Sequence, residues 1–305
     1  MSKTLLVCND AGAATLLAYW CIQERNDFVC AIYGPAQKIF SQNDFRFTDE
    51  PIKSLLTKRK YNKIVTGTGW MTDIEKTAIK YAVTNNIYCI SAIDHWVNYK
   101  ERFILNGKHY HPNEIWVGDQ YALNIANKIF DKSIKVVRKN SPLQWKVDNL
   151  VKYKSSKNEN SYLKQDKRIL LVMEPIRKQW ANRKTIYKPE IESLIWFRNN
   201  LEKIITLLKV ENQISIFLRP HPSEESGKYA GFIEEWGECS NTKLRVSRTE
   251  DVFDDIYDSD IVLGCETQAL VIALMMKKQV GSILPPWSPR CSLPHSGIIH
   301  LGRLI

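Results

Sequence analysis

The sequence lacks any run of 18 consecutive apolar residues in its 305 positions, so we expect no membrane-spanning helix. It also lacks a secretory signal, because the N-terminal MSKTLLVCNDAG has one lysine and only a short apolar stretch. We therefore interpret the N-terminus as a first buried strand and expect a cytoplasmic protein.

Closely spaced cysteine pairs are absent. The seven cysteines are odd in number, none has C-x-x-C spacing, and several lie inside apolar runs. Such residues are usually small buried hydrophobic side chains in a reducing compartment. We expect neither a disulfide framework nor a zinc site.

Glycine-rich phosphate motifs are absent as well. Neither G-x-G-x-x-G nor G-x-x-x-x-G-K occurs, so the sequence does not support a dinucleotide oxidoreductase or a P-loop ATPase. TGTGW at 66–70 is a weaker signal, because small-residue loops are common. We expect no cofactor.

Acidic residues are scarce in one segment. Residues 132–188 contain sixteen Lys or Arg and only four Asp or Glu, a surplus that exceeds the net charge of +10 of the whole chain. This segment can be a solvated linker surface, or it can attract anionic lipid or a phosphorylated substrate. We expect no nucleic-acid binding, because no helix-turn-helix, zinc-finger or RNA-binding signature accompanies the charge.

Short apolar runs alternate with segments of helical period, which is typical of βαβ units around a parallel sheet. We predict an α/β fold with two Rossmann-like doubly wound domains that face a cleft, since the length suits two domains better than one. The predicted parts are an N-terminal domain at 1–145, a polar basic linker at 146–166 and a C-terminal domain at 167–305.

The predicted strands are Thr4–Cys8, Phe28–Tyr33, Lys63–Thr66, Ile87–Ala92, Glu114–Val117, Ile134–Val137, Arg168–Met173, Ile214–Leu218, Lys243–Val246, Asp260–Leu263 and Val280–Leu284. The predicted helices are Ala13–Glu24, Ile52–Lys60, Asp73–Thr84, Gln120–Phe130, Glu190–Lys209, Lys228–Trp236, Asp251–Tyr257 and Thr267–Lys277.

The ends of these strands carry the candidate site residues, because open parallel sheets bind ligands outside the carboxyl ends of their strands. In the C-terminal domain, FLRPHPSEE at 217–225 places Arg219, His221 and Ser223 after a strand. Pro220 and Pro222 fix the loop backbone. Arginine offers a planar fork of donors for phosphate, and a rigid histidine can donate to a phosphate oxygen. The alternative is a stiff turn with a surface arginine and a capped histidine.

A second motif, SDIVLGCETQ at 259–268, ends a strand and begins an apolar helix. Thr267 or Glu266 would cap that helix, whose free backbone amides form an anion site. Glu266, or Glu174 at another strand end, would accept hydrogen bonds from a ribose or sugar hydroxyl. A plain helix cap is the alternative.

In the N-terminal domain, Asp94 and His95 follow a strand and precede aromatic residues. An aspartate beside a histidine there could take the proton of an acceptor hydroxyl, and Asp10 is the rival base. Gly12, Thr68 and Gly69 stand at neighbouring strand ends. The alternative is that Asp94 caps a loop.

The sequence resembles GT-B glycosyltransferases of bacterial surface-polysaccharide pathways. The resemblance rests on two Rossmann-like halves, on RPHPSE at 219–224 and on the later Cys-Glu-Thr turn before a helix. The nearest resemblance is to enzymes with cytidine-activated donors, namely sialyltransferases, Kdo transferases and CDP-glycerol transferases. It implies that His221 matches the histidine of the His-Pro motif that holds the donor phosphate. It also implies that Glu266 and Thr267 occupy the place of the second phosphate motif.

The resemblance implies transfer of a sugar from a nucleotide donor, CMP- or CDP-linked rather than UDP-linked, to a glycan or lipid-linked glycan. The N-terminal domain would hold the acceptor and the C-terminal domain the donor. We expect no metal, because basic residues can neutralise the phosphate, and the basic segment suggests peripheral contact with an anionic inner membrane. The alternatives are a nucleotide-sugar 2-epimerase or hydrolase, and a non-catalytic bilobed sugar- or nucleotide-binding protein.

Overall fold

The computed structural model describes residues 4–24, 28–58, 60–69, 72–157, 166–176, 180, 187–211, 213–239, 242–247, 249 and 251–305. The chain forms two compact units, Met1–Pro142 and Leu143–Ile305. The division lies three residues before the predicted end of the first domain.

The first unit is built on a parallel sheet of seven strands in the order β3-β2-β1-β4-β5-β8-β9. Their bounds are β1 Thr4–Cys8, β2 Phe28–Ile32, β3 Phe47–Thr48, β4 Lys63–Thr66, β5 Tyr88–Ile93, β8 Glu114–Val117 and β9 Lys135–Arg138. Between β5 and β8 in the sequence, β6 (Ile104–Leu105) and β7 (Lys108–His109) form a small antiparallel hairpin. The central strands are almost fully buried because helices cover both faces.

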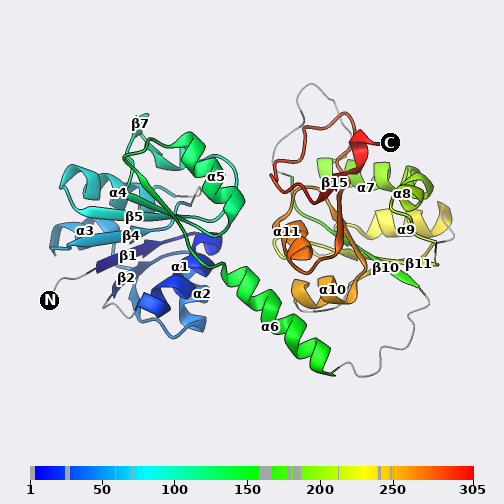
Figure 1. Cartoon of the computed structure of the whole chain (residues 1–305), viewed down its shortest axis with the longest axis horizontal. Coiled ribbons are helices and arrows are strands. Elements are labelled where there is room, and N and C mark those ends of the chain that lie inside the picture. The colour runs from blue at the N-terminus through cyan, green and yellow to red at the C-terminus, as the bar shows by residue number, and fades with distance from the viewer. Residues whose placement is uncertain are drawn as a thin grey trace. The chain divides into compact units, whose positions relative to one another are not determined.

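The helices of this unit are α1 Ala11–Glu24, α2 Ala36–Gln42, α3 Ile52–Lys58, α4 Ile74–Thr84 and α5 Gln120–Ile129, with a short 3-10 helix at Glu101–Phe103. Figure 1 shows α1 and α2 on one face of the sheet and α3 and α4 on the other. Trp20 of α1 packs edge-on against Trp116 of β8, with 5.9 Å between ring centroids. The buried aromatic residues and the small cysteines Cys8, Cys21 and Cys30 fill this core.

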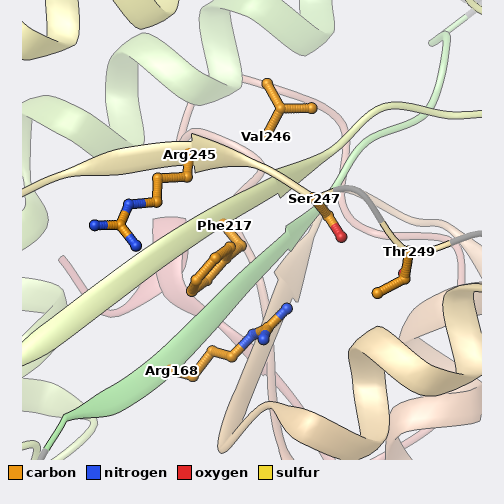
Figure 2. Close-up of a pocket in the computed structure, with 6 residues that line it drawn as sticks. All are labelled: Arg168, Phe217, Arg245, Val246, Ser247 and Thr249. Carbon is orange, nitrogen blue, oxygen red and sulfur yellow. The ribbon is translucent and has the colours of Figure 1, made fainter.

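The second unit has a parallel sheet of six strands in the order β12-β11-β10-β13-β14-β15. Their bounds are β10 Lys167–Val172, β11 Ile214–Arg219, β12 Leu244–Val246, β13 Ile261–Gly264, β14 Gln279–Ser282 and β15 Ile298–His300. On one face of this sheet, strands β10, β11 and β12 carry polar and aromatic side chains, among them Arg168, Phe217 and Arg245 (Figure 2).

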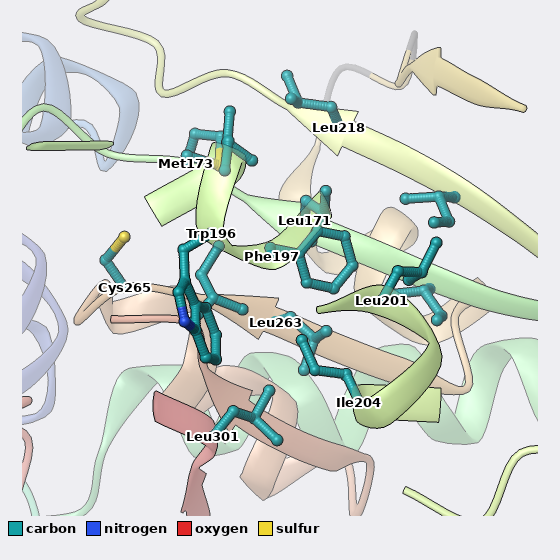
Figure 3. Close-up of a cluster of buried hydrophobic side chains, with 14 of the residues drawn as sticks. Leu171, Met173, Trp196, Phe197, Leu201, Ile204, Leu218, Leu263, Cys265 and Leu301 are labelled. Carbon is teal, nitrogen blue, oxygen red and sulfur yellow. The ribbon is translucent and has the colours of Figure 1, made fainter. Parts of the chain in front are cut away.

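The helices of this unit are α6 Pro142–Lys157, α7 Pro189–Asn199, α8 Leu201–Leu207, α9 Ala230–Cys239, α10 Val252–Asp258 and α11 Gln268–Met275, followed by a 3-10 helix at Leu301–Arg303. The opposite face of the sheet packs against α7, α8 and α9, where Leu171, Phe197 and Leu263 are fully buried (Figure 3). The two units therefore have separate hydrophobic cores.

Both sheets have a topological switch point, where the strand order reverses. It lies between β1 and β4 in the first unit and between β10 and β13 in the second. Loops after such neighbouring strands diverge to opposite faces and leave room for a ligand at their carboxyl ends. The fold thus places the candidate residues of each unit at its switch point or at the end of the next strand along the sheet.

The predicted α/β fold with two doubly wound domains is confirmed, while the cleft between them stays a prediction. Several local predictions were wrong. The first half of the predicted irregular linker forms helix α6, and the predicted helix Glu190–Lys209 is broken at Asn200 into α7 and α8. Residues 158–165 of that linker, and Trp70 of the TGTGW loop, lie outside the described residues.

In the described part of the chain, none of the helices has both the length and the apolar character that crossing a membrane requires.

Candidate functional site

A pocket of about 310 Å³ opens at the carboxyl ends of β10 and β11 in the second unit. The loop after β11 forms one wall, and the starts of α10 and α11 form the others. It is lined by Val172, Met173, Arg219, Pro220, His221, Pro222, Asp251, Val252, Thr267, Gln268, Ala269 and Ile272. The structure thus brings Arg219, His221 and Thr267 to one pocket.

The loop that carries His221 is a tight, internally bonded turn. The backbone N–H of His221 donates to Glu224 Oε2 (2.9 Å), and the backbone N–H of Glu224 donates to the carbonyl of His221 (2.9 Å). Pro220 and Pro222 restrict the backbone on each side of the histidine. The imidazole is therefore presented at the pocket by a pre-ordered loop.

Hydrogen bonds also set the tautomer of His221. Its Nδ1 accepts the backbone N–H of Ser223 (3.1 Å) and lies 2.8 Å from the Ser223 hydroxyl. Because Nδ1 is an acceptor, the neutral ring carries its proton on Nε2. His221 then offers an N–H donor on the side of the ring away from the loop. Ser223, which is predicted as a phosphate contact, also orients this histidine.

Behind this loop lies a buried charge network that the sequence analysis missed. Lys228 of the turn before α9 contacts both Glu224 and Glu190, and the Tyr229 hydroxyl donates to Glu224 Oε1 (2.8 Å). Burial alone would lower the pKa of Lys228, but the two carboxylates outweigh burial and raise it. Glu224 thereby anchors the His221 loop to the body of the unit.

Arg219 has hydrogen-bond partners that the sequence did not predict. Its Nη1 donates to Asp255 Oδ2 (2.6 Å) and to the Thr249 hydroxyl (2.8 Å) and carbonyl (3.0 Å). Asp255, on α10, is fully buried and also accepts from Arg168 Nη2 (3.0 Å). Arg219 lines the pocket, and the buried carboxylate of Asp255 fixes its orientation.

Glu174 and Glu266 form a pair at the same sheet edge. The backbone N–H of Glu266 donates to Glu174 Oε1 (2.6 Å), and Glu266 Oε2 accepts from the backbone N–H (3.1 Å) and hydroxyl (2.8 Å) of Ser292. Burial raises the pKa of Glu174 to about 7, although the N–H of Glu266 opposes that shift. Thr267 caps α11 by accepting the N–H of Ala269 (3.3 Å), which confirms one of the two predicted caps.

In the first unit, the switch point brings Asp10, Gly12 and Asp94 together. Asp10 Oδ2 accepts the backbone N–H of Gly12 (2.9 Å) and of Ala13 (3.3 Å) at the start of α1. A Cβ on Gly12 would lie 2.1 Å from Asp94 Oδ2, so the absence of a side chain there admits the second carboxylate. Burial, and then the charge of Asp94, raise the pKa of Asp10.

Arg102 fixes Asp94 in this arrangement. The guanidinium is buried, and Nη1 donates to Asp94 Oδ1 (2.8 Å) and to the carbonyl (2.9 Å) and hydroxyl (3.1 Å) of Thr68. The Thr68 hydroxyl in turn donates to the carbonyl of Ala92 (2.8 Å). Thr68 is therefore part of the support of Asp94, whereas the half-buried His95 lies beside Trp96, with 5.3 Å between ring centroids.

Glu75 lies beneath these groups and was not predicted. It is fully buried in the first turn of α4, and its Oε1 accepts the backbone N–H of Asn9 (2.7 Å). Its Oε2 has no hydrogen-bond partner among the described residues. Burial raises the pKa of Glu75. A Cβ on Gly69 would meet both Asp10 and Glu75, so that glycine allows the close packing of this turn.

The described residues hold no cluster of three or more His, Cys, Asp or Glu that could bind a metal ion. One D-x-D spacing occurs, Asp258-Ser259-Asp260, but it precedes β13, at the amino end of that strand. Asp260 there accepts from Lys167 Nζ (3.0 Å) and from the backbone N–H of Arg168 (2.9 Å).

Comparison of the sequence finds no protein-family model and no curated protein that matches it. Solved structures do share its fold. UDP-GlcNAc 2-epimerase from Methanocaldococcus jannaschii has a TM-score of 0.58 at 12% identity, over 92% of this chain and 83% of that one. The 2-epimerase from Neisseria meningitidis, bound to UDP-GlcNAc, has a TM-score of 0.53 at 12% identity, over 88% and 78%.

MurG from Acinetobacter baumannii is also similar, with a TM-score of 0.51 at 10% identity over 92% of this chain and 76% of that one. At such low identities the similarity concerns the fold alone. The chain therefore has a GT-B-like fold of two Rossmann-like domains.

Proposed function

We propose that this chain is a glycosyltransferase that moves a sugar from a nucleotide-activated donor to a hydroxyl of a glycan. The observation that carries the proposal is the pocket of the second unit, where the His221 loop and the start of α11 converge. An Nε2–H donor and backbone N–H groups at a helix start are suited to a phosphate.

On the donor side, His221 and the start of α11 would bind the phosphate that becomes the leaving group. Donors held in place before reaction stabilise the negative charge that develops as the glycosidic bond breaks. The positive charge of the Arg219 guanidinium would also attract the phosphate. The ion pair with Asp255 would reduce that attraction. Glu266, supported by Glu174, would accept hydrogen bonds from ribose hydroxyls.

On the acceptor side, Asp94 or Asp10 would take the proton of the attacking hydroxyl. Arg102 holds Asp94 by a 2.8 Å ion pair, which fixes the position of that carboxylate. Asp10 is the alternative base, and burial together with the charge of Asp94 raises its pKa. The reaction would use no metal, so its rate should be unchanged by a chelator.

The donor nucleotide is proposed to be cytidine-linked, on the resemblance to cytidine-dependent enzymes. Several structures that share the fold carry UDP-sugars in their names, so uridine is the competing base. A thermal-shift screen of CMP, CDP, UDP and GDP decides between them. The proposal expects CMP or CDP to raise the melting temperature most, and a response to UDP alone would contradict the cytidine assignment.

The central test is turnover of the donor by His221→Ala. Because the histidine is exposed, the variant should fold normally and lose turnover by about two orders of magnitude, the usual effect of removing a preorganised donor. His109→Ala, which removes an exposed histidine of β7, is the matched control. Equal turnover of both variants would contradict the proposal.

A nucleotide-sugar 2-epimerase or hydrolase is the second candidate, because three of the similar structures are named as UDP-GlcNAc 2-epimerases. Incubation of nucleotide sugars without an acceptor separates the classes. A new sugar epimer, or stoichiometric release of sugar and nucleotide, would favour the second candidate. Binding with no turnover under any condition, unaltered in Asp94→Ala, would indicate a non-catalytic binding protein.

A further inference from the structure

A second hollow lies in the second unit, and its described lining includes no residue of the His221 loop. It has a volume of about 770 Å³ and is lined by Arg168, Phe217, Arg245, Val246, Ser247 and Thr249. Figure 2 shows Arg168, Phe217 and Arg245 on β10, β11 and β12, with Ser247 and Thr249 just after β12. Phe217 and Arg245 are paired in register on adjacent strands, so their side chains share one face of the sheet.

The described lining residues include two arginines and no carboxylate. Arg245 is exposed on the edge strand β12, and the described residues make no ion pair with it. Arg168 stacks on Phe217, with its guanidinium carbon 3.9 Å from the ring centroid. Its Nε is buried without a hydrogen-bond partner in the described part of the chain, so the protein does not saturate this guanidinium.

The nearby acidic charge is already shared. Asp255 accepts from Arg168 (3.0 Å) and from Arg219 (2.6 Å), and it also contacts the Ser247 hydroxyl. One buried carboxylate therefore faces two guanidinium groups, and Arg245 adds a third positive charge at the mouth of the hollow. This excess favours a bound anion.

We propose that this hollow is a second anion-binding site, which takes the phosphate group of a phosphorylated small molecule. Arg245 and the unsaturated guanidinium of Arg168 act as donors, in the planar geometry that suits phosphate oxygens. The volume falls in the range of small-molecule sites, about 300–1,000 Å³, so more than the phosphate of the ligand fits. Phe217 supplies an apolar surface beside the anion.

The test is a calorimetric titration with inorganic pyrophosphate at constant ionic strength. His221→Ala serves as the background, because it weakens phosphate binding in the pocket of the proposed donor. The second change is Arg245→Gln, and the matched control is Lys243→Gln, which removes one exposed positive charge two residues away without touching the lining. Melting temperatures confirm that both double variants are folded.

We expect pyrophosphate to bind the His221→Ala background, Arg245→Gln to weaken that binding at least fivefold, and Lys243→Gln to change it less than twofold. Equal weakening by both substitutions would show general electrostatic attraction and overturn the site. Absence of binding to the background would overturn it as well. Neither outcome depends on glycosyl transfer, so the proposed function is tested separately.

Discussion

At the scale of single residues, Asp255 holds two arginines of neighbouring strands at once. Removing one member of a buried ion pair leaves a charge without compensation and costs about 3–5 kcal/mol. We expect Asp255→Asn to lower the free energy of unfolding by an amount in that range, measured by urea denaturation. The two guanidinium groups would then repel each other across a neutral amide.

The matched control for this substitution lies one residue away. Asp254 pairs with Lys154 (2.7 Å) at the surface, where both side chains are partly exposed. Such pairs contribute about 0–1 kcal/mol, so Asp254→Asn should change stability little. Equal losses in the two variants would show that Asp255 is not the centre of a buried network.

Glu174 predicts a pH dependence of stability. Its pKa of about 7 in the folded protein lies above the ordinary glutamate value of 4.5, mainly because of burial. The folded state therefore binds more protons than the unfolded state between those values, and stability must fall as pH rises through this window. Glu174→Gln keeps an acceptor for the Glu266 N–H and should flatten the decline.

The measurement is the free energy of unfolding of wild type and Glu174→Gln at intervals from pH 5 to pH 8. The wild type should lose on the order of 2 kcal/mol relative to the variant across that range. Two parallel curves would mean that the carboxyl titrates as it does in the unfolded chain.

The sequence showed some site residues and hid others for physical reasons. His221 and Thr267 were visible because prolines and a strand-to-helix turn mark their local geometry. Asp255, Glu75 and Glu224 were hidden, because each acts through a partner distant in the sequence or through a buried network. Arg102 was hidden as well, because it acts through Asp94 and Thr68.

At the scale of elements, the start of α1 is closely packed against the loop after β5. Gly12→Ala should leave the helix intact, since alanine favours helix, but its Cβ would meet Asp94 Oδ2 at 2.1 Å. We expect a folded protein with turnover reduced at least tenfold, because Asp94 must leave its place beside Arg102. Steady-state kinetics with a circular-dichroism melt measure both effects.

Gly118→Ala is the control for this prediction. It lies at the end of β8, where an added Cβ would meet only Leu16 Cδ2 at 3.9 Å, an ordinary contact. Both variants should melt within a few degrees of the wild type. Full turnover in Gly12→Ala would show that Asp94 takes no part in the reaction.

Short apolar runs that form buried strands were predicted well, as β1, β4 and β8 show by their matching bounds. Elements that depend on tertiary contacts were not predicted well. Helix α6 is polar, and ion pairs of Lys146 with Asp251 (2.8 Å) and of Lys154 with Asp254 hold it against α10. Strand β15 has only three residues, too few for a period to appear.

At the scale of the whole molecule, the basic segment carries less free charge than its sequence suggests. Lys146 and Lys154 pair with carboxylates of the segment around α10, and Lys167 pairs with Asp260 (3.0 Å). We still propose peripheral contact with anionic membranes, and expect binding to phosphatidylglycerol vesicles that decreases as salt rises, since exposed charges are screened. Flotation assays at 50 and about 300 mM salt test it, and binding to neutral vesicles alone would contradict it.

The measurement that tests the account most directly is calorimetric titration of wild type and His221→Ala with the nucleotide that stabilises the protein most. A rigid histidine that donates from Nε2 to the phosphate should make the variant bind at least tenfold more weakly, with His109→Ala unchanged. The same affinity in all three proteins would mean that the nucleotide phosphate does not bind at the β11 loop.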